Sequence, residues 1–152
     1  MKKFKLLVLL IGILFLTACA NKTAITSDKF ISIMEEENFD IVNALEQFSD
    51  YDEIKEAYIA LEDDGDYQIE FYVLDNDNNA IKLYNHNKEI FEDSKGSVSS
   101  YTNVDLNNIN KYTLSTNGKF NIVSRIDNTM IYLSVDYEFK DEVIDILKKL
   151  GY

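Results

Sequence analysis

The chain has 152 residues, with 15 basic and 27 acidic side chains and a formal net charge of −12 at pH 7. A protein with this charge repels the phosphate backbone of nucleic acids, so we expect no nucleic-acid partner. One cysteine and one histidine are too few ligands for the usual zinc site, and the 5 glycines form no phosphate-binding loop. We therefore expect neither a metal nor a cofactor.

The first 18 residues have the parts of an export signal. Lys2, Lys3 and Lys5 precede an apolar run over residues 6–16. A helix over that run spans about 16 Å, roughly half the hydrocarbon core of a bilayer. This length suits a cleavable signal peptide and is too short for a membrane-spanning helix.

The apolar run ends in Leu16-Thr17-Ala18-Cys19, which resembles the lipobox of bacterial lipoproteins. The resemblance implies cleavage between Ala18 and Cys19 and attachment of diacylglycerol to the Cys19 thiol, with fatty acids such as palmitate. Two or three acyl chains bind a membrane durably, at about 0.8 kcal/mol per buried CH₂. We therefore expect an extracytoplasmic protein held on the cell membrane by its lipid. The alternatives are an ordinary signal peptide with a free cysteine nearby, or an uncleaved anchor.

Cleavage leaves residues 19–152, with a lipidated tether over 19–26 and a single domain over 27–152. Without the three lysines of the signal, the formal charge falls from −12 to −15, which favours cationic partners. No cysteine remains for a disulfide, so the core alone must stabilise the domain. Proline is absent and Asn, Lys, Ile and Tyr are abundant. This bias is typical of an AT-rich Gram-positive genome.

The C-terminal half has strong hairpin signals. Alternating segments over residues 111–116, 119–126 and 129–136 are separated by Asn117-Gly118 and Asp127-Asn128. Both dipeptides tolerate positive φ, so the pattern predicts a three-stranded antiparallel meander. A two-residue turn at Asp127-Asn128 places six apolar side chains on one face: Phe120, Ile122, Ile126, Ile131, Leu133 and Val135.

The first of these two turns decides where Tyr112 and Leu114 point. A two-residue turn at Asn117-Gly118 would place both side chains on the face opposite to Phe120. A three-residue loop, Thr116-Asn117-Gly118, with a bulge would bring them onto the core face, and we expect that loop.

Helical spacing predicts three helices. One follows the meander, with Phe139, Val143, Ile146, Leu147 and Leu150 on its apolar side and Gly151 as its stop. The others cover residues 27–37, with Ser27 as the N-cap, and residues 76–93.

Strands are expected over residues 54–62 and 67–74, joined by a hairpin loop. Residues 39–44 fit either a strand or more helix, and residues 97–106 form an extended connection or an edge strand. The fold class is therefore α+β, an antiparallel sheet with helices packed on one face. The order of elements is consistent with two βββα pseudo-repeats.

Few residues offer catalytic chemistry. His86 lies among polar residues and has no second histidine or cysteine to assist it, so we expect a surface histidine. Residues 75–79 resemble the start of an EF-hand calcium loop, yet Ala80 replaces the required glycine and His86 the required glutamate. Helix capping explains them better. A glycosidase needs two carboxylates that face each other in a cleft, and nothing in the sequence places two acidic residues in that arrangement. We therefore favour a non-enzymatic protein, with no catalytic residue.

Arg125 and Tyr132 are the candidate binding residues. On the expected register they share the non-core face of the meander with Val123 and Met130. A lone guanidinium beside aromatic groups can receive a carboxylate of a ligand or partner. We favour a cross-strand salt bridge, or stacking on Tyr132, for Arg125, because single charges on sheets normally pair across strands.

These patterns favour a lipid-anchored binding module for an envelope or extracellular protein. The alternative is a small carboxylate-dependent hydrolase, or a small-ligand receptor, for envelope carbohydrate or peptide.

Overall fold

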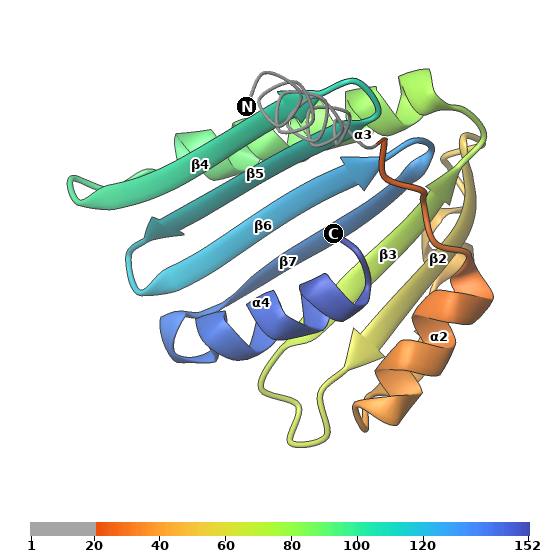
Figure 1. Ribbon diagram of the computed structural model, residues 1–152, viewed down its shortest axis with the longest axis horizontal. Coiled ribbons are helices and arrows are strands. Elements are labelled where there is room, and N and C mark those ends of the chain that lie inside the picture. The colour runs from red at the N-terminus through yellow and green to blue at the C-terminus, as the bar shows by residue number, and fades with distance from the viewer. Residues whose placement is uncertain (1–20) are drawn as a thin grey trace, which may run out of the picture.

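The computed structural model describes residues 21–152, so the expected signal peptide and lipobox, Cys19 included, lie outside the described residues. One antiparallel sheet has the strand order β1-β2-β3-β7-β6-β5-β4 (Figure 1). Its strands are β1 Asp40–Asn43, β2 Ile54–Leu61, β3 Gln68–Leu74, β4 Ser99–Leu106, β5 Ile109–Thr116, β6 Lys119–Ile126 and β7 Thr129–Asp136. The helices are α2 Ser27–Glu36, α3 Asp77–Asp93 and α4 Lys140–Lys149, with 3₁₀ turns η1 Leu45–Phe48 and η2 Tyr137–Phe139. The expected α+β class is confirmed.

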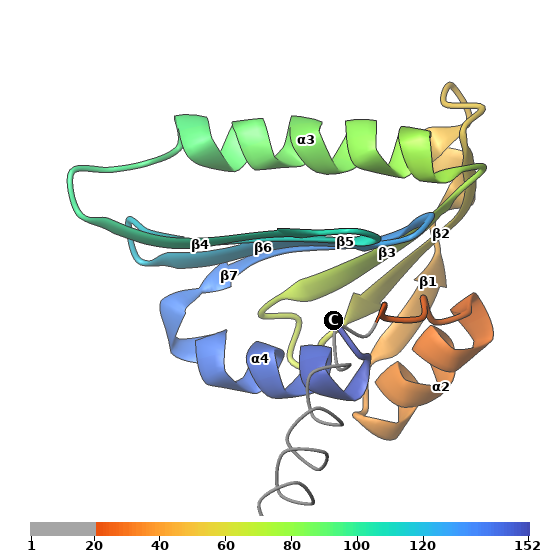
Figure 2. The ribbon, with the colours of Figure 1, turned by 45° about the horizontal axis from the view of Figure 1, so that its top comes forward.

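Helices cover both faces of the sheet, which corrects the expectation that they share one. Figure 2 shows α3 on one side and α2 with α4 on the other. The reason lies in the central strand β6, which is buried at every position except its first and therefore needs cover on both sides. The two βββα pseudo-repeats are not confirmed, because the helix after β3 and the helix after β7 lie on opposite faces.

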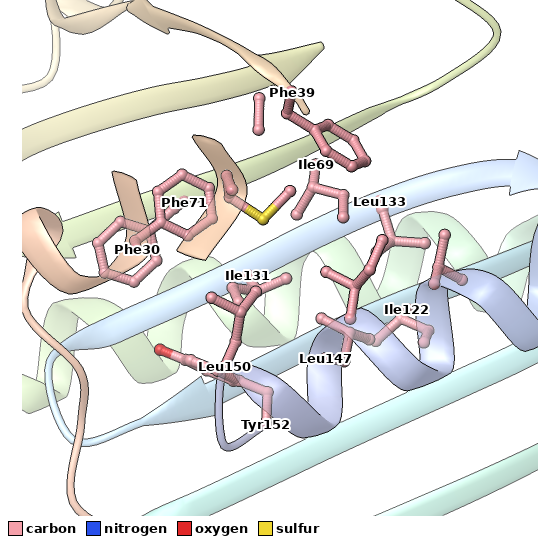
Figure 3. Packing of buried hydrophobic residues seen from close by; sticks show 14 of the residues in the cluster. Phe30, Phe39, Ile69, Phe71, Ile122, Ile131, Leu133, Leu147, Leu150 and Tyr152 are labelled. Carbon is pink, nitrogen blue, oxygen red and sulfur yellow. The ribbon is translucent and has the colours of Figure 1, made fainter. Parts of the chain in front are cut away.

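Two hydrophobic cores result. The first joins α2 and α4 to the sheet through residues that include Phe30, Met34, Ile69, Phe71, Ile122, Ile131, Leu133, Leu147 and Leu150 (Figure 3). Within it, the rings of Phe30 and Phe71 stack with centroids 4.7 Å apart. The second core lies under α3 and includes Tyr72, Leu74, Ala80, Tyr84, Phe91, Tyr112, Leu114, Val123 and Met130.

The turn between β5 and β6 has two residues, so the expected three-residue loop is wrong. Thr116 pairs with Lys119, and Asn117 and Gly118 have φ values of 51° and 76°. Tyr112 and Leu114 therefore point away from the first core and are buried in the second, where α3 covers them. The expected two-residue turn at Asp127-Asn128 is confirmed, and its six apolar residues all lie in the first core.

Residues 39–44 contain strand β1, and residues 97–106 contain the edge strand β4. Helix α2 has Thr26 as its N-cap instead of Ser27, because the Thr26 hydroxyl accepts a hydrogen bond from the Lys29 N–H at 3.3 Å. None of the helices in residues 21–152 is long and apolar enough to cross a membrane.

The N-terminal end of the described chain is held against the domain. The Lys22 ammonium donates to the Gly151 carbonyl at 2.7 Å, and the Lys22 carbonyl accepts from the Asn108 side chain at 2.6 Å. The Asn107 side chain donates to the side chain of Asn21 at 3.3 Å. Residues 21 and 22 therefore lie beside the β4–β5 turn and the end of α4.

The two faces of β5 should respond differently to truncation. Leu114 is fully buried under α3, whereas its neighbour Thr113 points to the other face and is only half-buried. We expect Leu114→Ala to lower the free energy of unfolding by about 2–5 kcal/mol. Thr113→Ala should cost about 1 kcal/mol or less. Urea denaturation of both variants measures the difference, and equal losses would contradict the two-core arrangement.

Candidate binding groove

The face of the sheet under α3 is not completely covered. A pocket of about 220 Å³ opens between α3 and residues 48–54, which connect η1 to β2. Its floor is formed by side chains of β3 and β7, namely Glu70, Tyr72, Met130 and Tyr132. Its walls include Phe48 and Tyr51 on one side and Leu83 and His86 on the other.

Two neighbouring hollows extend this pocket into a groove. One of about 250 Å³ shares Tyr51 and His86 with it, and one of about 340 Å³ shares Glu70 and Tyr132. We call the whole surface the tyrosine groove and define it by the residues that line its central pocket, Tyr51, Glu70, Tyr72, His86 and Tyr132.

The groove exists because β3 and β7 separate. Their pairing covers only residues 70–73 of β3 and 129–132 of β7, and it ends at the pair Glu70 and Tyr132. Beyond that pair the two strands diverge toward the β2–β3 hairpin (Figure 1). The hollow of about 340 Å³ occupies this opening, so the pair Glu70 and Tyr132 lies in the middle of the groove.

Aromatic neighbours fix the two tyrosines of the groove floor. The ring of Phe48 meets Tyr72 edge-on, with centroids 5.3 Å apart, and Phe91 stacks on Tyr132 at 5.1 Å. Such pairs add about 0.5–1.5 kcal/mol each beyond area burial. Both rings are therefore held in place before any ligand arrives.

Glu70 is the charged group of the groove floor. It is half-buried, and its carboxylate accepts hydrogen bonds from the Tyr72 hydroxyl and, at 2.7 Å, from the Gln68 amide. Burial, then the bond to Glu70, raises the pKa of Tyr72 far above its usual range. Burial and the nearby Glu70 charge also raise the pKa of Tyr132. The two phenols therefore stay neutral at physiological pH.

The lining of the central pocket holds a single carboxylate, that of Glu70. A glycosidase-type mechanism requires two facing carboxyl groups whose pKa values are driven apart. Within residues 21–152, no three His, Cys, Asp or Glu side chains are grouped to hold a metal ion. The arrangement is suited to holding a positively charged group against aromatic rings.

His86 and residues 75–79, at the start of α3, lie as the sequence predicts. His86 is exposed on α3, at the rim of the groove. Asn76 is the N-cap of α3, and its side chain accepts from the Asn79 N–H at 3.0 Å. The Asn79 amide also donates to Asp75 at 2.9 Å. These side chains cap the helix, as the capping explanation predicts.

Arg125 and Tyr132 share one face, as predicted, but α3 covers Arg125. Its side chain is 2% exposed, and it donates to the Asn110 side chain at 2.6 Å and to the Asp127 carbonyl at 2.7 Å. Neither a salt bridge nor a stack on Tyr132 forms within the described residues. Arg125 thus connects β5, β6 and the β6–β7 turn, and of the two candidates only Tyr132 lines an open surface.

Comparisons with known proteins add little. No protein-family model matches the chain, and no curated protein matches it significantly. It has a likeness to the crystal structure of a GTP binding regulator from Thermotoga maritima, with 18% identity over 83% of this chain and 84% of that chain. The TM-score is 0.48, and a likeness this distant carries no functional argument.

The raised pKa of Tyr72 should make the protein less stable in alkali. Above about pH 10 the unfolded chain releases this proton while the folded protein keeps it, so the free energy of unfolding falls as pH rises. Tyr72→Phe should make this fall shallower and should cost about 1 kcal/mol at neutral pH through the lost hydrogen bond.

Urea denaturation at about pH 9 and about pH 11 measures both effects. Tyr51→Phe, an exposed change at the rim of the same groove, is the control and should not alter stability at neutral pH. The same alkaline loss in Tyr72→Phe and in the unmodified protein would contradict the assignment.

Proposed function

We propose that the protein is an extracytoplasmic lipoprotein, anchored on the cell membrane through Cys19, whose domain binds an envelope protein without catalysis. The tyrosine groove is the proposed binding surface, and its ligand is a lysine or arginine side chain of the partner. The observation that carries the proposal is the single half-buried carboxylate, Glu70, set between two fixed tyrosine rings in an open pocket.

The chemistry of the groove favours a cation. A carboxylate attracts an ammonium or guanidinium group, and tyrosine faces add about 0.5–2 kcal/mol of cation–π attraction as water is excluded. The overall charge of −15 expected for the mature chain would raise the local concentration of cationic partners and speed their association. No cation of the described chain pairs with Glu70 among its salt bridges, so the carboxylate can accept an external one.

The groove suits an extended peptide better than a compact small molecule, because its small central pocket opens into two further hollows. Sites for drug-sized ligands measure about 300–1,000 Å³. The central pocket measures about 220 Å³, which suits one long side chain, and the adjoining hollows leave room for the flanking residues of a peptide. A hydrolase of envelope carbohydrate is disfavoured because the central pocket has one carboxylate. A peptide receptor would use the same contacts as the proposed module.

The anchor itself can be tested directly. Replacing Cys19 with alanine removes the proposed attachment site, and no other cysteine exists in the chain. We expect the unmodified protein to fractionate with membranes and to carry the mass of a diacylglyceryl group on Cys19. Cys19→Ala should lack that mass and lose its membrane retention. Retention of Cys19→Ala in washed membranes would contradict lipid anchoring.

The groove can be tested by cross-linking capture from native membranes with the full-length lipidated protein. We expect one dominant envelope protein, whose recovery falls about tenfold in Glu70→Gln, since a hydrogen bond to a charged group is worth about 1.5–3 kcal/mol. Glu89→Gln removes the same charge from an exposed site on α3 and is the matched control. Equal recovery with both variants would show that the groove is not the binding surface.

A further inference from the structure

One strip of the surface differs in character from the rest of this acidic protein. It consists of the side chains of β4 and β5 that point away from α3: Ser100, Thr102, Val104, Leu106, Ile109, Lys111, Thr113 and Ser115. We call it the outer strip. It contains hydroxyls, aliphatic groups and one lysine, and no acidic side chain, since Asp105 points to the α3 face. Leu106 is 60% exposed.

No helix of residues 21–152 covers this strip. Figure 1 shows α4 lying in front of β7 while β4 and β5 extend beyond it. Between α4 and the strip is a hollow of about 280 Å³, lined by Lys111 and Lys140 together with hydroxyls of the strip. Neither of these two lysines forms a salt bridge within residues 21–152.

Lys111 and Lys140 line the hollow together, whereas the nearby Lys148 is paired with Asp145 at 2.8 Å. Lys111 is half-buried, and its pKa is lowered first by burial and then by the charges of Lys22 and Lys148. A group of cations with hydroxyl donors beside them is complementary to phosphate oxygens. A strand edge with exposed aliphatic residues such as Leu106 is also suited to the interface between water and lipid.

The end of the tether lies beside the strip. Asn21 and Lys22 are hydrogen-bonded to the β4–β5 turn and to Gly151, as described above. Cys19 is two residues before Asn21, and two residues of chain reach at most about 7 Å. A lipid on Cys19 would therefore enter the bilayer close to one end of the outer strip.

From this placement we propose that the outer strip is a membrane-contact surface, which binds the phospholipid headgroups around the protein's own anchor. The inference rests on the proposed function, because it requires the lipid on Cys19. The strip then faces the bilayer, and the tyrosine groove, on the opposite face of the sheet, faces away from it toward envelope partners. The exposed carboxylates of α4, Asp141 and Asp145 among them, lie on the same side of the sheet, so the contact is limited to the part of the strip that extends beyond α4.

Adjacent residues of β4 provide a matched pair of probes. Thr102 belongs to the outer strip, Asn103 points to the opposite face, and both are exposed. Because Cys19 is the single cysteine and its thiol is consumed by the lipid, Thr102→Cys or Asn103→Cys supplies a unique thiol for a fluorophore. Each labelled, lipidated protein is reconstituted into vesicles of phosphatidylcholine and phosphatidylglycerol, some of which carry a headgroup-attached nitroxide quencher.

We expect the label at residue 102 to be quenched several times more strongly than the label at residue 103. Lys111→Glu should bring the two values closer together, because it reverses the central positive charge of the strip. Equal quenching at both sites in protein that floats with the vesicles would overturn the membrane-contact surface and leave the lipid anchor intact. Protein that does not float would contradict the anchor and the inference together.

Discussion

The strands at the centre of this sheet must bury both of their faces, and the rest of the molecule is arranged around that requirement. Antiparallel sheets commonly leave one face in water. Here Phe120 and Ile122 of β6 enter the core under α4, while Val123 and Arg125 enter the core under α3. Two separate layers of helix are therefore needed, and the part of the sheet between α3 and residues 48–54 stays open.

The tyrosine groove is a result of this incomplete cover. Helix α3 crosses the sheet as a single rod, and residues 48–54 form the opposite wall, so the floor between them stays accessible. The separation of β3 from β7 after Glu70 widens the opening further. The half-buried carboxylate of Glu70 accepts two hydrogen bonds at this point, and the neutral phenols beside it add no competing charge.

Local patterns in the sequence predicted the helices and strands well, but they did not predict which face of the sheet each helix covers. The Asn117-Gly118 and Asp127-Asn128 dipeptides located both turns of the meander, because positive φ has a strong residue preference. The loop at Asn117-Gly118 was expected to be one residue too long because a single core was assumed. If the sheet had only one buried face, a bulge would be needed to bring Tyr112 and Leu114 onto it. In the structure, α3 buries both side chains on the other face.

The candidate site was only partly predictable for a related reason. Tyr132 was named from its place on the meander, and it lines the groove. Glu70 and Tyr72 belong to a strand whose partner, β7, lies far along the chain, so no local spacing brings them together with Tyr132. Arg125 was placed on the correct face, but its burial depends on a helix whose position the pattern of β6 does not reveal.

The long-range pairing of Glu70 with Tyr132 also has a consequence for folding. Closing the loop between Glu70 and Tyr132 costs conformational entropy before the stabilising contacts between the two strands can form. The β3–β7 contacts are therefore expected to form late. The hairpins β2–β3 and β5–β6–β7 are local and can assemble first. A chain that emerges N-terminus first therefore has no groove until its last strand is free to dock. The tyrosine groove would then arise only in the compartment where folding is completed.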